Sequence, residues 1–266
     1  MNRWRVALIA ASLATALIVL ASKPTASRDA ILNVNGQNLH LETFGAFGPT
    51  VVFEAGLGTD AGTWQFVAGP VATFAQVVLY DRAGLGRSLP MIKTSPVTAD
   101  AAAASLHALL DAADIRPPYL LVGHSLGGLY MQMFAKKYPE AVSGVVLLDS
   151  ASPDAPSELK TRARLEPGTA AYLEEEGVSE SNDQIKNGAP FPDVPLTVIA
   201  ATDHGPFFKE WEPTLMRLQQ QLATLSLQST FIVAQGSGHD IQVDRPQTVI
   251  DAVRRMAEAT FSRGVR

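Results

Sequence analysis

The 266-residue sequence contains no cysteine. This absence excludes disulfide bonds, thiolate metal sites, cysteine nucleophiles and lipid attachment at an N-terminal cysteine. Cysteine usage therefore says nothing about the compartment in which the protein works, and the compartment has to be inferred from another part of the sequence.

Concentrated basic clusters are also lacking. The sequence has 21 Lys and Arg residues against 26 Asp and Glu residues, which gives a formal net charge of −5 at pH 7. Nucleic acids and anionic membrane surfaces are bound through dense basic patches. The charge pattern therefore excludes nucleic acid as the main partner and favours a neutral or small organic molecule.

Hydrophobic residues, by contrast, make up 47% of the chain, and charged residues make up 18%. A chain of this length and composition can bury a sizeable core without dividing into several domains. We therefore expect one main domain, over residues 31–266.

The N-terminal segment is typical of a secretory signal. Arg3 and Arg5 form a short basic region before an apolar run of about 16 residues, at positions 6–21. A membrane-spanning helix needs roughly 20 such residues. We therefore predict a signal peptide over residues 1–21, cleaved after Ala21, with an uncleaved inner-membrane anchor as the alternative. Both interpretations place the remaining chain outside the cytoplasm, as a periplasmic or secreted protein.

After a polar linker over residues 22–30, short apolar runs alternate with longer runs of helical periodicity. This alternation predicts the α/β class, with a mostly parallel sheet and helices on both of its faces. Asn35-Gly36 favours the tight turn of an opening antiparallel hairpin. Strands are expected at residues 31–34, 39–43, 50–54, 76–80, 119–122, 144–148, 196–200 and 230–234. The main helices are expected at residues 98–113, 126–137, 210–225 and 246–259.

The stretch from residue 152 to residue 192 interrupts this alternation. It contains five prolines and the acidic run Glu174-Glu175-Glu176. Long insertions between core strands commonly shape a substrate pocket. We predict that this stretch forms a small lid.

Ser125 lies at the centre of Gly-His-Ser-Leu-Gly, residues 123–127, which has the pattern G-x-S-x-G. Five residues alone are weak evidence, but an expected buried strand precedes them and an expected helix follows. A serine at such a turn has an exposed hydroxyl, and the glycines let strand and helix approach closely. The pattern therefore predicts that Ser125 is a nucleophile.

A serine nucleophile needs a base, normally a histidine that a carboxylate holds in place. His239 follows the last expected strand, in a loop at the sheet edge where Ser125 also lies, so we expect it to be the base. His204 also follows a core strand, but the chain order of serine, acid and base favours the later histidine. The remaining histidines are expected to be structural residues: His40, His107 and His124.

Two carboxylates fit that chain order as the acid. Asp149 directly follows the strand at residues 144–148, and Asp203 follows the strand at residues 196–200. An aspartate at a strand end often only caps the next turn. The residue pattern therefore leaves both aspartates open.

Two backbone N–H groups are candidates for an oxyanion hole. Leu126 begins the helix after Ser125, where the N–H groups and the helix dipole face a developing negative charge. The glycines of residues 55–58, Ala-Gly-Leu-Gly, allow a second N–H, that of Leu57, to face the same point. The sequence predicts no metal site.

Four segments, in this order and spacing, resemble the α/β-hydrolase superfamily, specifically its compact esterase-like serine hydrolases. They are residues 54–58 (Glu-Ala-Gly-Leu-Gly), 81–88 (Asp-Arg-Ala-Gly-Leu-Gly-Arg-Ser), 123–128 (Gly-His-Ser-Leu-Gly-Gly) and 236–239 (Gly-Ser-Gly-His). The resemblance covers residue 31 to the C-terminus, and in the family the segment 81–88 is a structural loop.

The chain departs from the family pattern in two places. Ala55-Gly56 replaces a frequent His-Gly, which keeps the backbone donor and removes a side chain near the oxyanion hole. The spacing from Pro195 to Asp203 is about one residue short for members whose acid follows that strand. Other members carry the acid after the preceding strand. The resemblance therefore implies Asp149 as the acid, with Asp203 as the alternative.

The resemblance also implies an activity. It is that of a carboxylic ester hydrolase (EC 3.1.1) that acts on a small ester-like substrate through an acyl-enzyme intermediate, without a metal or organic cofactor. Lactonases, C–C bond hydrolases, perhydrolases and iminopeptidases use the same constellation, and the fold does not separate them. A ligand-binding or sensor protein without catalysis is the alternative from a different class.

Overall fold

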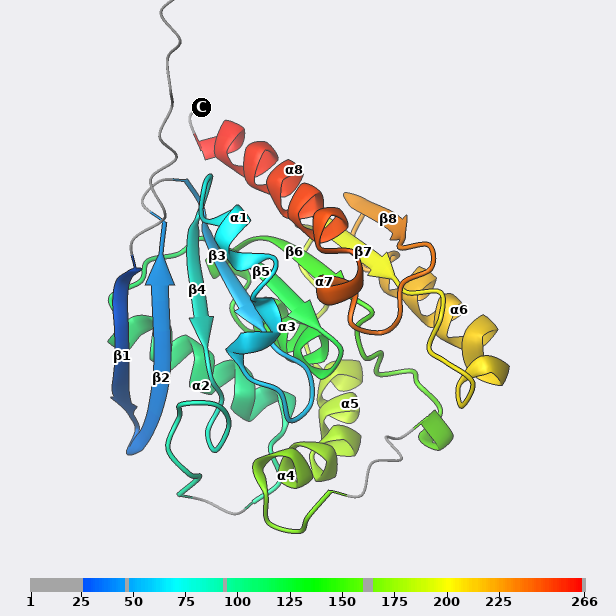
Figure 1. Cartoon of the computed structure of the whole chain (residues 1–266), viewed down its shortest axis with the longest axis horizontal. Helices are drawn as coiled ribbons and strands as arrows, with labels where there is room; N and C mark the ends of the chain where they lie inside the picture. Colours follow the sequence, from blue (N-terminus) through cyan, green and yellow to red (C-terminus); the bar gives the residue numbers. More distant parts are fainter. Residues whose placement is uncertain (1–25, 46–47, 93–94, 160–164, 265–266) are drawn as a thin grey trace, which may run out of the picture.

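The computed structural model describes residues 26–45, 48–92, 95–159 and 165–264 (Figure 1). The predicted signal peptide, residues 1–21, lies outside the described residues, so cleavage or anchoring stays a prediction. Within the described ranges, no helix is long and apolar enough to cross a membrane.

One 8-stranded sheet forms the centre of the fold, with the order β1-β2-β4-β3-β5-β6-β7-β8. The pairs β1–β2 and β2–β4 are antiparallel, and the remaining pairs are parallel. The predicted class, a mostly parallel sheet with an opening hairpin, is confirmed. The strands are β1 (Ala26–Val34), β2 (Gln37–Phe44), β3 (Thr50–Glu54), β4 (Gln76–Tyr80), β5 (Tyr119–His124), β6 (Val142–Leu148), β7 (Leu196–Ala200) and β8 (Ser229–Val233).

The first strand begins at Ala26, earlier than the sequence indicated, so residues 26–30 of the predicted linker belong to the sheet. Polar side chains in this part hold it in place. Arg28 donates a hydrogen bond to the carbonyl oxygen of Ala113 at 2.6 Å, and Asp29 lies 3.0 Å from the buried His40 ring. These contacts explain why a polar segment forms a strand.

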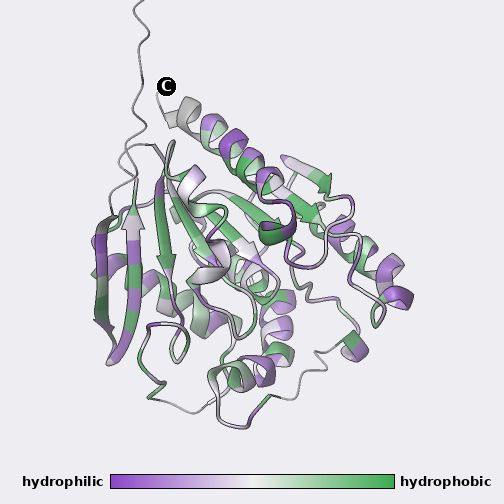
Figure 2. Cartoon of the chain, in the orientation of Figure 1, coloured by the Kyte–Doolittle hydropathy of each residue, from purple (hydrophilic) through white to green (hydrophobic). Residues whose placement is uncertain are grey.

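Helices cover both faces of the sheet, as predicted. The core is divided into two clusters, because successive side chains of a strand point to opposite faces. Leu121 packs with α2 and α3 on one face, whereas Leu120 packs with α1 and α8 on the other. In Figure 2 the central strands are largely green, and the flanking helices alternate green with purple. The helices are α1 (Ala68–Val71), α2 (Ala99–Ala112), α3 (Leu126–Lys137), α4 (Ala170–Glu176), α5 (Val178–Asn187), α6 (Glu212–Leu222), α7 (Ile241–Asp244) and α8 (Pro246–Gly264).

The insertion at residues 152–192 contains two of these helices, α4 and α5, and a short 3₁₀ turn at Ser157–Leu159. Both helices lie beside the end of the sheet toward which the parallel strands run (Figure 1). Thr169 caps α4 by accepting a hydrogen bond from the N–H of Tyr172, as N-cap threonines do. The insertion is thus a folded part of the domain next to the carboxyl ends of the strands.

Candidate active site

Ser125 lies between β5 and α3 with φ 54° and ψ −122°, a conformation that few residues other than glycine adopt. Three backbone hydrogen bonds hold it there: its N–H donates to the Leu148 carbonyl at 3.1 Å, and its carbonyl accepts from the N–H groups of Ala151 and Gly128, at 2.9 and 3.0 Å. The turn therefore holds the serine rigidly at the carboxyl edge of the sheet.

The glycines around Ser125 are required by close packing. A Cβ on Gly127 would lie 2.4 Å from the Ala55 carbonyl oxygen, and one on Gly123 would lie 2.7 Å from the Gly127 carbonyl oxygen. Such distances are shorter than any van der Waals contact, and the opposing atoms are backbone that cannot rotate away. The G-x-S-x-G pattern is thus a steric requirement of this turn.

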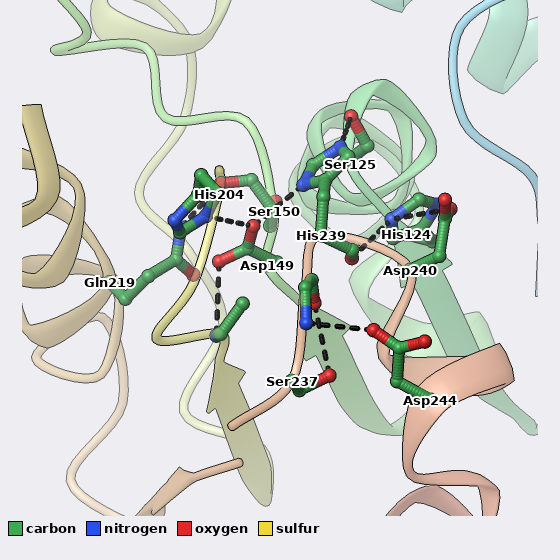
Figure 3. A network of polar contacts seen from close by, with 12 residues as sticks. His124, Ser125, Asp149, Ser150, His204, Gln219, Ser237, His239, Asp240 and Asp244 are labelled. Carbon is green, nitrogen blue, oxygen red and sulfur yellow. Dashed lines mark hydrogen bonds and ion pairs between the residues drawn. The ribbon is translucent and has the colours of Figure 1, made fainter. Parts of the chain in front are cut away.

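His239 connects Ser125 to Asp149 (Figure 3). Its Nε2 lies 2.9 Å from Ser125 Oγ, and its Nδ1 lies 2.6 Å from Asp149 Oδ2. The backbone places all three residues at the same edge of the sheet, because Ser125 follows β5, Asp149 follows β6 and His239 follows β8. The structure therefore brings together the predicted nucleophile, the predicted base and the preferred acid.

Asp149 is 5% exposed and follows β6 with φ 38°. Its Oδ1 accepts a hydrogen bond from the Ala201 N–H at 3.2 Å, and its Oδ2 faces both His239 and His204. Burial alone would raise the pKa of this carboxyl, but the hydrogen bonds from the two histidines outweigh burial and lower it. Asp149 is therefore an ionised acceptor.

The alternative acid, Asp203, lies elsewhere. Its side chain is exposed and accepts a hydrogen bond from the N–H of Gly205 at 3.1 Å, so it caps its own turn. Among the described residues, no hydrogen bond or ion pair joins it to His239. Its backbone N–H is bound to the Ser237 carbonyl, which aligns the loop that carries the base.

His204, the competing candidate for the base, does not contact Ser125 among the described contacts. It lies on the far side of Asp149 from His239, with Nε2 2.7 Å from Asp149 Oδ2 and Nδ1 3.0 Å from Glu212 Oε2. Burial would lower the pKa of His204, but the hydrogen bonds and charges of Asp149 and Glu212 outweigh it and raise the pKa to about 9. The sequence indicated no such pairing.

Asp149, His204 and His239 offer ligand-type atoms that all lie within 4.8 Å of one another. Both imidazoles, however, approach the same oxygen, at 2.6 and 2.7 Å. Donor atoms around a tetrahedral zinc ion would lie about 3.3 Å apart, because each metal bond is about 2.0 to 2.2 Å long. The observed spacing fits hydrogen bonds, not a coordination sphere.

The other histidines have structural partners, as expected. His40 is buried between Asp81 and Asp29, at 2.9 and 3.0 Å. His107 stacks on Tyr138 with ring centroids 4.1 Å apart. His124 is buried, and its Nε2 lies 3.0 Å from the carbonyl oxygen of His239.

The two predicted oxyanion donors lie next to Ser125. Leu126 opens α3, and Gly56, the neighbour of Leu57, is so close to the nucleophile that an added Cβ would lie 3.4 Å from Ser125 Cβ. Among the described residues, no hydrogen bond uses the N–H of Leu57 or that of Leu126. The oxyanion hole formed by these two groups stays a prediction.

A buried ionic cluster, which the sequence did not reveal, supports the loop that carries Leu57. Arg82 donates to the carbonyls of Ala55 and Gly56 at 2.8 and 2.6 Å. It also pairs with Glu54 and with Glu174 of α4, each at 2.6 Å.

Glu174 itself accepts a hydrogen bond from the N–H of Gly58 at 2.8 Å. The insertion is thus bonded directly to the loop that carries Leu57. Only the acidic run at residues 174–176 hinted at a role for Glu174, because partners 92 positions away, at Arg82, and 116 positions away, at Gly58, are not readable from a single sequence.

Comparisons with known proteins identify the family of this chain. The sequence model described as the alpha/beta hydrolase fold matches residues 49–173. The uncharacterized protein YqjL of Bacillus subtilis (strain 168) is 34% identical over 217 residues, which cover 77% of this chain and 82% of that protein. The chain belongs to the α/β-hydrolase family.

Solved structures show that this α/β hydrolase shares its fold with distant enzymes. A thermophilic esterase from Thermogutta terrifontis superimposes with a TM-score of 0.71 at 19% identity, covering 88% of this chain and 99% of that one. The enol-lactonase from Burkholderia xenovorans LB400 gives a TM-score of 0.66 at 19% identity, with coverages of 85% and 99%. At this identity the likeness concerns the fold alone.

Proposed function

We propose that this α/β hydrolase is a serine hydrolase that cleaves a carboxylic ester or a similar acyl bond through an acyl-enzyme intermediate. The observation that carries the proposal is the continuous hydrogen-bonded series Ser125–His239–Asp149, with separations of 2.9 and 2.6 Å. A serine hydroxyl is a weak nucleophile unless such a base removes its proton.

In the proposed reaction, His239 Nε2 takes the proton of Ser125 as Oγ attacks the carbonyl carbon. The resulting tetrahedral oxyanion is stabilised by the N–H groups of Leu57 and Leu126. Asp149 accepts the Nδ1–H of the imidazolium and stabilises its charge.

The intermediate collapses when His239 gives its proton to the leaving alkoxide, which departs as an alcohol. A water molecule then replaces the alcohol, loses a proton to the same Nε2 and attacks the acyl carbon. Return of that proton to Ser125 Oγ releases the carboxylic acid, so that one water is consumed for each ester cleaved.

The substrate class is proposed as small carboxylic esters, which corresponds to EC 3.1.1. Two neighbours in fold, an esterase and an enol-lactonase, support this class by the names of their own activities. Lactone, C–C bond or aminoacyl cleavage would use the same three residues, because the fold does not determine the leaving group. No metal or organic cofactor takes part in the proposed steps.

Residues 152–192 are proposed as the lid over this site, since Glu174 of α4 contacts the loop that carries Leu57. Export, with the mature protein in the periplasm, secreted or held at the inner membrane, is proposed from the sequence of residues 1–21. Measuring the mass of the mature N-terminus distinguishes cleavage after Ala21 from an uncleaved anchor.

A fluorophosphonate probe tests the proposed nucleophile. The full chain is treated with the probe, and the modified peptide is identified by mass spectrometry. We expect labelling at Ser125, hydrolysis of short p-nitrophenyl esters, and loss of both in Ser125→Ala. The exposed Ser179 of α5 supplies the matched control, since Ser179→Ala is expected to behave as wild type.

If Ser125 is not labelled and no ester is turned over, the hydrolase proposal is wrong and a ligand-binding or sensor role is favoured. If Ser125 is labelled, a panel of esters, lactones and aminoacyl compounds identifies the substrate class by comparison of kcat/KM values.

A further inference from the structure

His204 occupies an unusual position for a histidine, because both of its ring nitrogens face carboxylate oxygens. Nε2 lies 2.7 Å from Asp149 Oδ2, and Nδ1 lies 3.0 Å from Glu212 Oε2. The backbone N–H of His204 also donates to Glu212 Oε1, at 2.7 Å. The ring is thus held from both sides, and its side chain is only 8% exposed.

The geometry determines the charge of this ring. An ionised carboxylate can only accept hydrogen bonds, so a ring nitrogen at such a distance from one must carry a hydrogen. Two nitrogens with hydrogens make an imidazolium. The raised pKa of His204, about 9, agrees with this assignment.

We propose that His204 is a positioning residue for the Ser125–His239–Asp149 series: a fixed second cation on Asp149 that aims its carboxylate and limits the negative charge offered to His239. This inference rests on the proposed function, because it concerns the residues proposed there as acid and base.

Two effects follow from this arrangement. Asp149 has a positive φ, and a third bond on its carboxylate, besides those from Ala201 and His239, fixes the orientation of that strained side chain. In addition, the His204 and His239 rings are 6.1 Å apart and approach the same Asp149 oxygen, so the positive charge of His204 offsets part of the negative charge that His239 meets there. Loss of that charge is therefore expected to change the pH dependence of the proposed reaction.

The other described charged and titratable groups near the His204 and His239 rings do not place a second positive charge next to Asp149. His124 lies 4.6 Å from the His239 ring, but burial, followed by repulsion from His239, lowers its pKa to about 3, so it is neutral. Asp240 lies 3.8 Å from His124 Nε2, and Asp244 accepts from the N–H of Gly238. Asp203 is exposed and caps its own turn, and Glu212 is the second partner of His204. Of the described groups that contact Asp149, only His204 and His239 are cationic or become so.

The test uses His204→Gln, because the Gln side chain can keep a neutral N–H donor near Asp149 while it removes the positive charge. The rate of Ser125 phosphonylation by a fluorophosphonate is measured against pH, which needs no knowledge of the natural substrate. We expect the acid limb of the profile to move upward by about one pH unit, with a plateau rate within a few-fold of wild type.

Two further variants control the experiment. Glu212→Gln leaves the imidazole in place and weakens its hold on the second proton, so the acid limb is expected to move in the same direction by a smaller amount. His107→Gln removes a histidine of α2 that stacks on Tyr138 and, among the described contacts, has none with Asp149, and the profile should then match wild type.

Nuclear magnetic resonance separates this inference from the proposed function. The chain has five histidines, whose ring signals can be assigned by single substitutions and titrated in the full protein. We expect the His204 signals to titrate near pH 9.

An acid limb that is unchanged, or moved downward, in His204→Gln would overturn the inference, and so would His204 signals that titrate near the ordinary value of 6.5 in the wild-type chain. Failure of the wild-type chain to react with the probe would instead refute the proposed function, and the ring titrations would still decide the role of His204.

Discussion

His124 Nε2 lies 3.0 Å from the carbonyl oxygen of His239. A carbonyl only accepts, so the hydrogen of the neutral His124 ring lies on Nε2. The residue before the proposed nucleophile therefore holds the loop of the proposed base. This bond restricts the distance between Ser125 and His239 through the backbone, independently of the side-chain contact between them.

The first prediction concerns that bond. His124→Phe should reduce kcat/KM about 10- to 100-fold, because a shift of about 1 Å in the base costs that much in rate. His124→Gln keeps a donor and should recover part of the loss. Full activity in His124→Phe would show that the loop of His239 is held by other contacts.

The second prediction compares the two aspartates that the sequence left open. Asp149→Asn should lower kcat by about 10⁴, since an amide cannot hold the same tautomer of the base. Asp203→Asn, at an exposed turn cap, should change kcat less than about threefold. Steady-state kinetics on one p-nitrophenyl ester measure both, and the reverse ranking would make Asp203 the acid.

The third prediction concerns stability against pH. The folded-state pKa of His204 is raised from an ordinary 6.5 to about 9. A raised pKa contributes stability fully below about pH 6.5, and this contribution is lost as the pH rises through about 9. Wild type should lose on the order of 1 to 3 kcal/mol of unfolding free energy over that window.

Urea unfolding at about pH 6.5 and about pH 10, in wild type and in His204→Gln, measures the loss. In His204→Gln the unfolding free energy should change much less over this pH window, because the glutamine side chain has no charge to lose. Equal pH dependence in both chains would assign the effect to other groups.

The fourth prediction concerns the buried cluster of Arg82, Glu54 and Glu174. Glu174→Gln leaves part of the buried Arg82 charge without its partner, which typically costs about 3 to 5 kcal/mol when one member of such a pair is removed. It should also lower kcat, through the loop at Gly58. Glu176→Gln, at an exposed position of the same helix, should be neutral in thermal unfolding and in activity.

The fifth prediction concerns the turn at Ser125. Gly127→Ala should destabilise the fold by about 2 to 3 kcal/mol, because the new methyl group meets the Ala55 carbonyl at 2.4 Å. Gly69→Ala meets no atom within 4 Å and should leave stability within about 1 kcal/mol of wild type. Thermal unfolding of the two variants gives the comparison.

Much of this fold could be predicted from the sequence, since its central strands are continuous apolar runs that end at tight turns. The expected runs at residues 50–54, 76–80 and 196–200 coincide with β3, β4 and β7. The last helix, expected at residues 246–259, buries one apolar face against the sheet, at Val249, Ile250, Val253, Met256 and Ala257. Helices α4 and α5 were not predicted, because they are short and lie in a proline-rich, polar stretch.

The residues of the candidate site likewise fall into those that the sequence predicts and those that it does not. Ser125, His239 and Asp149 each follow a core strand, so chain order and the common edge of parallel strands indicated that they meet. The bond of His204 to Asp149 depends on the fold of the loop after β7 and on the N-terminal end of α6, where Glu212 lies. No local sequence pattern predicts the conformation of that loop or the position of that helix end. The contact between Arg82 and Glu174 is not marked by a local pattern either.

The contacts at Ser125 join distant parts of the chain. His239 is 114 positions from Ser125 and 90 from Asp149, so a loop longer than a third of the protein must close before the base reaches its partners. Closing such a loop costs entropy and is slow. The contacts that it allows stabilise the fold only after the intervening strands have paired. We therefore expect recovery of hydrolase activity during refolding to report the docking of the C-terminal segment and to follow the recovery of secondary structure.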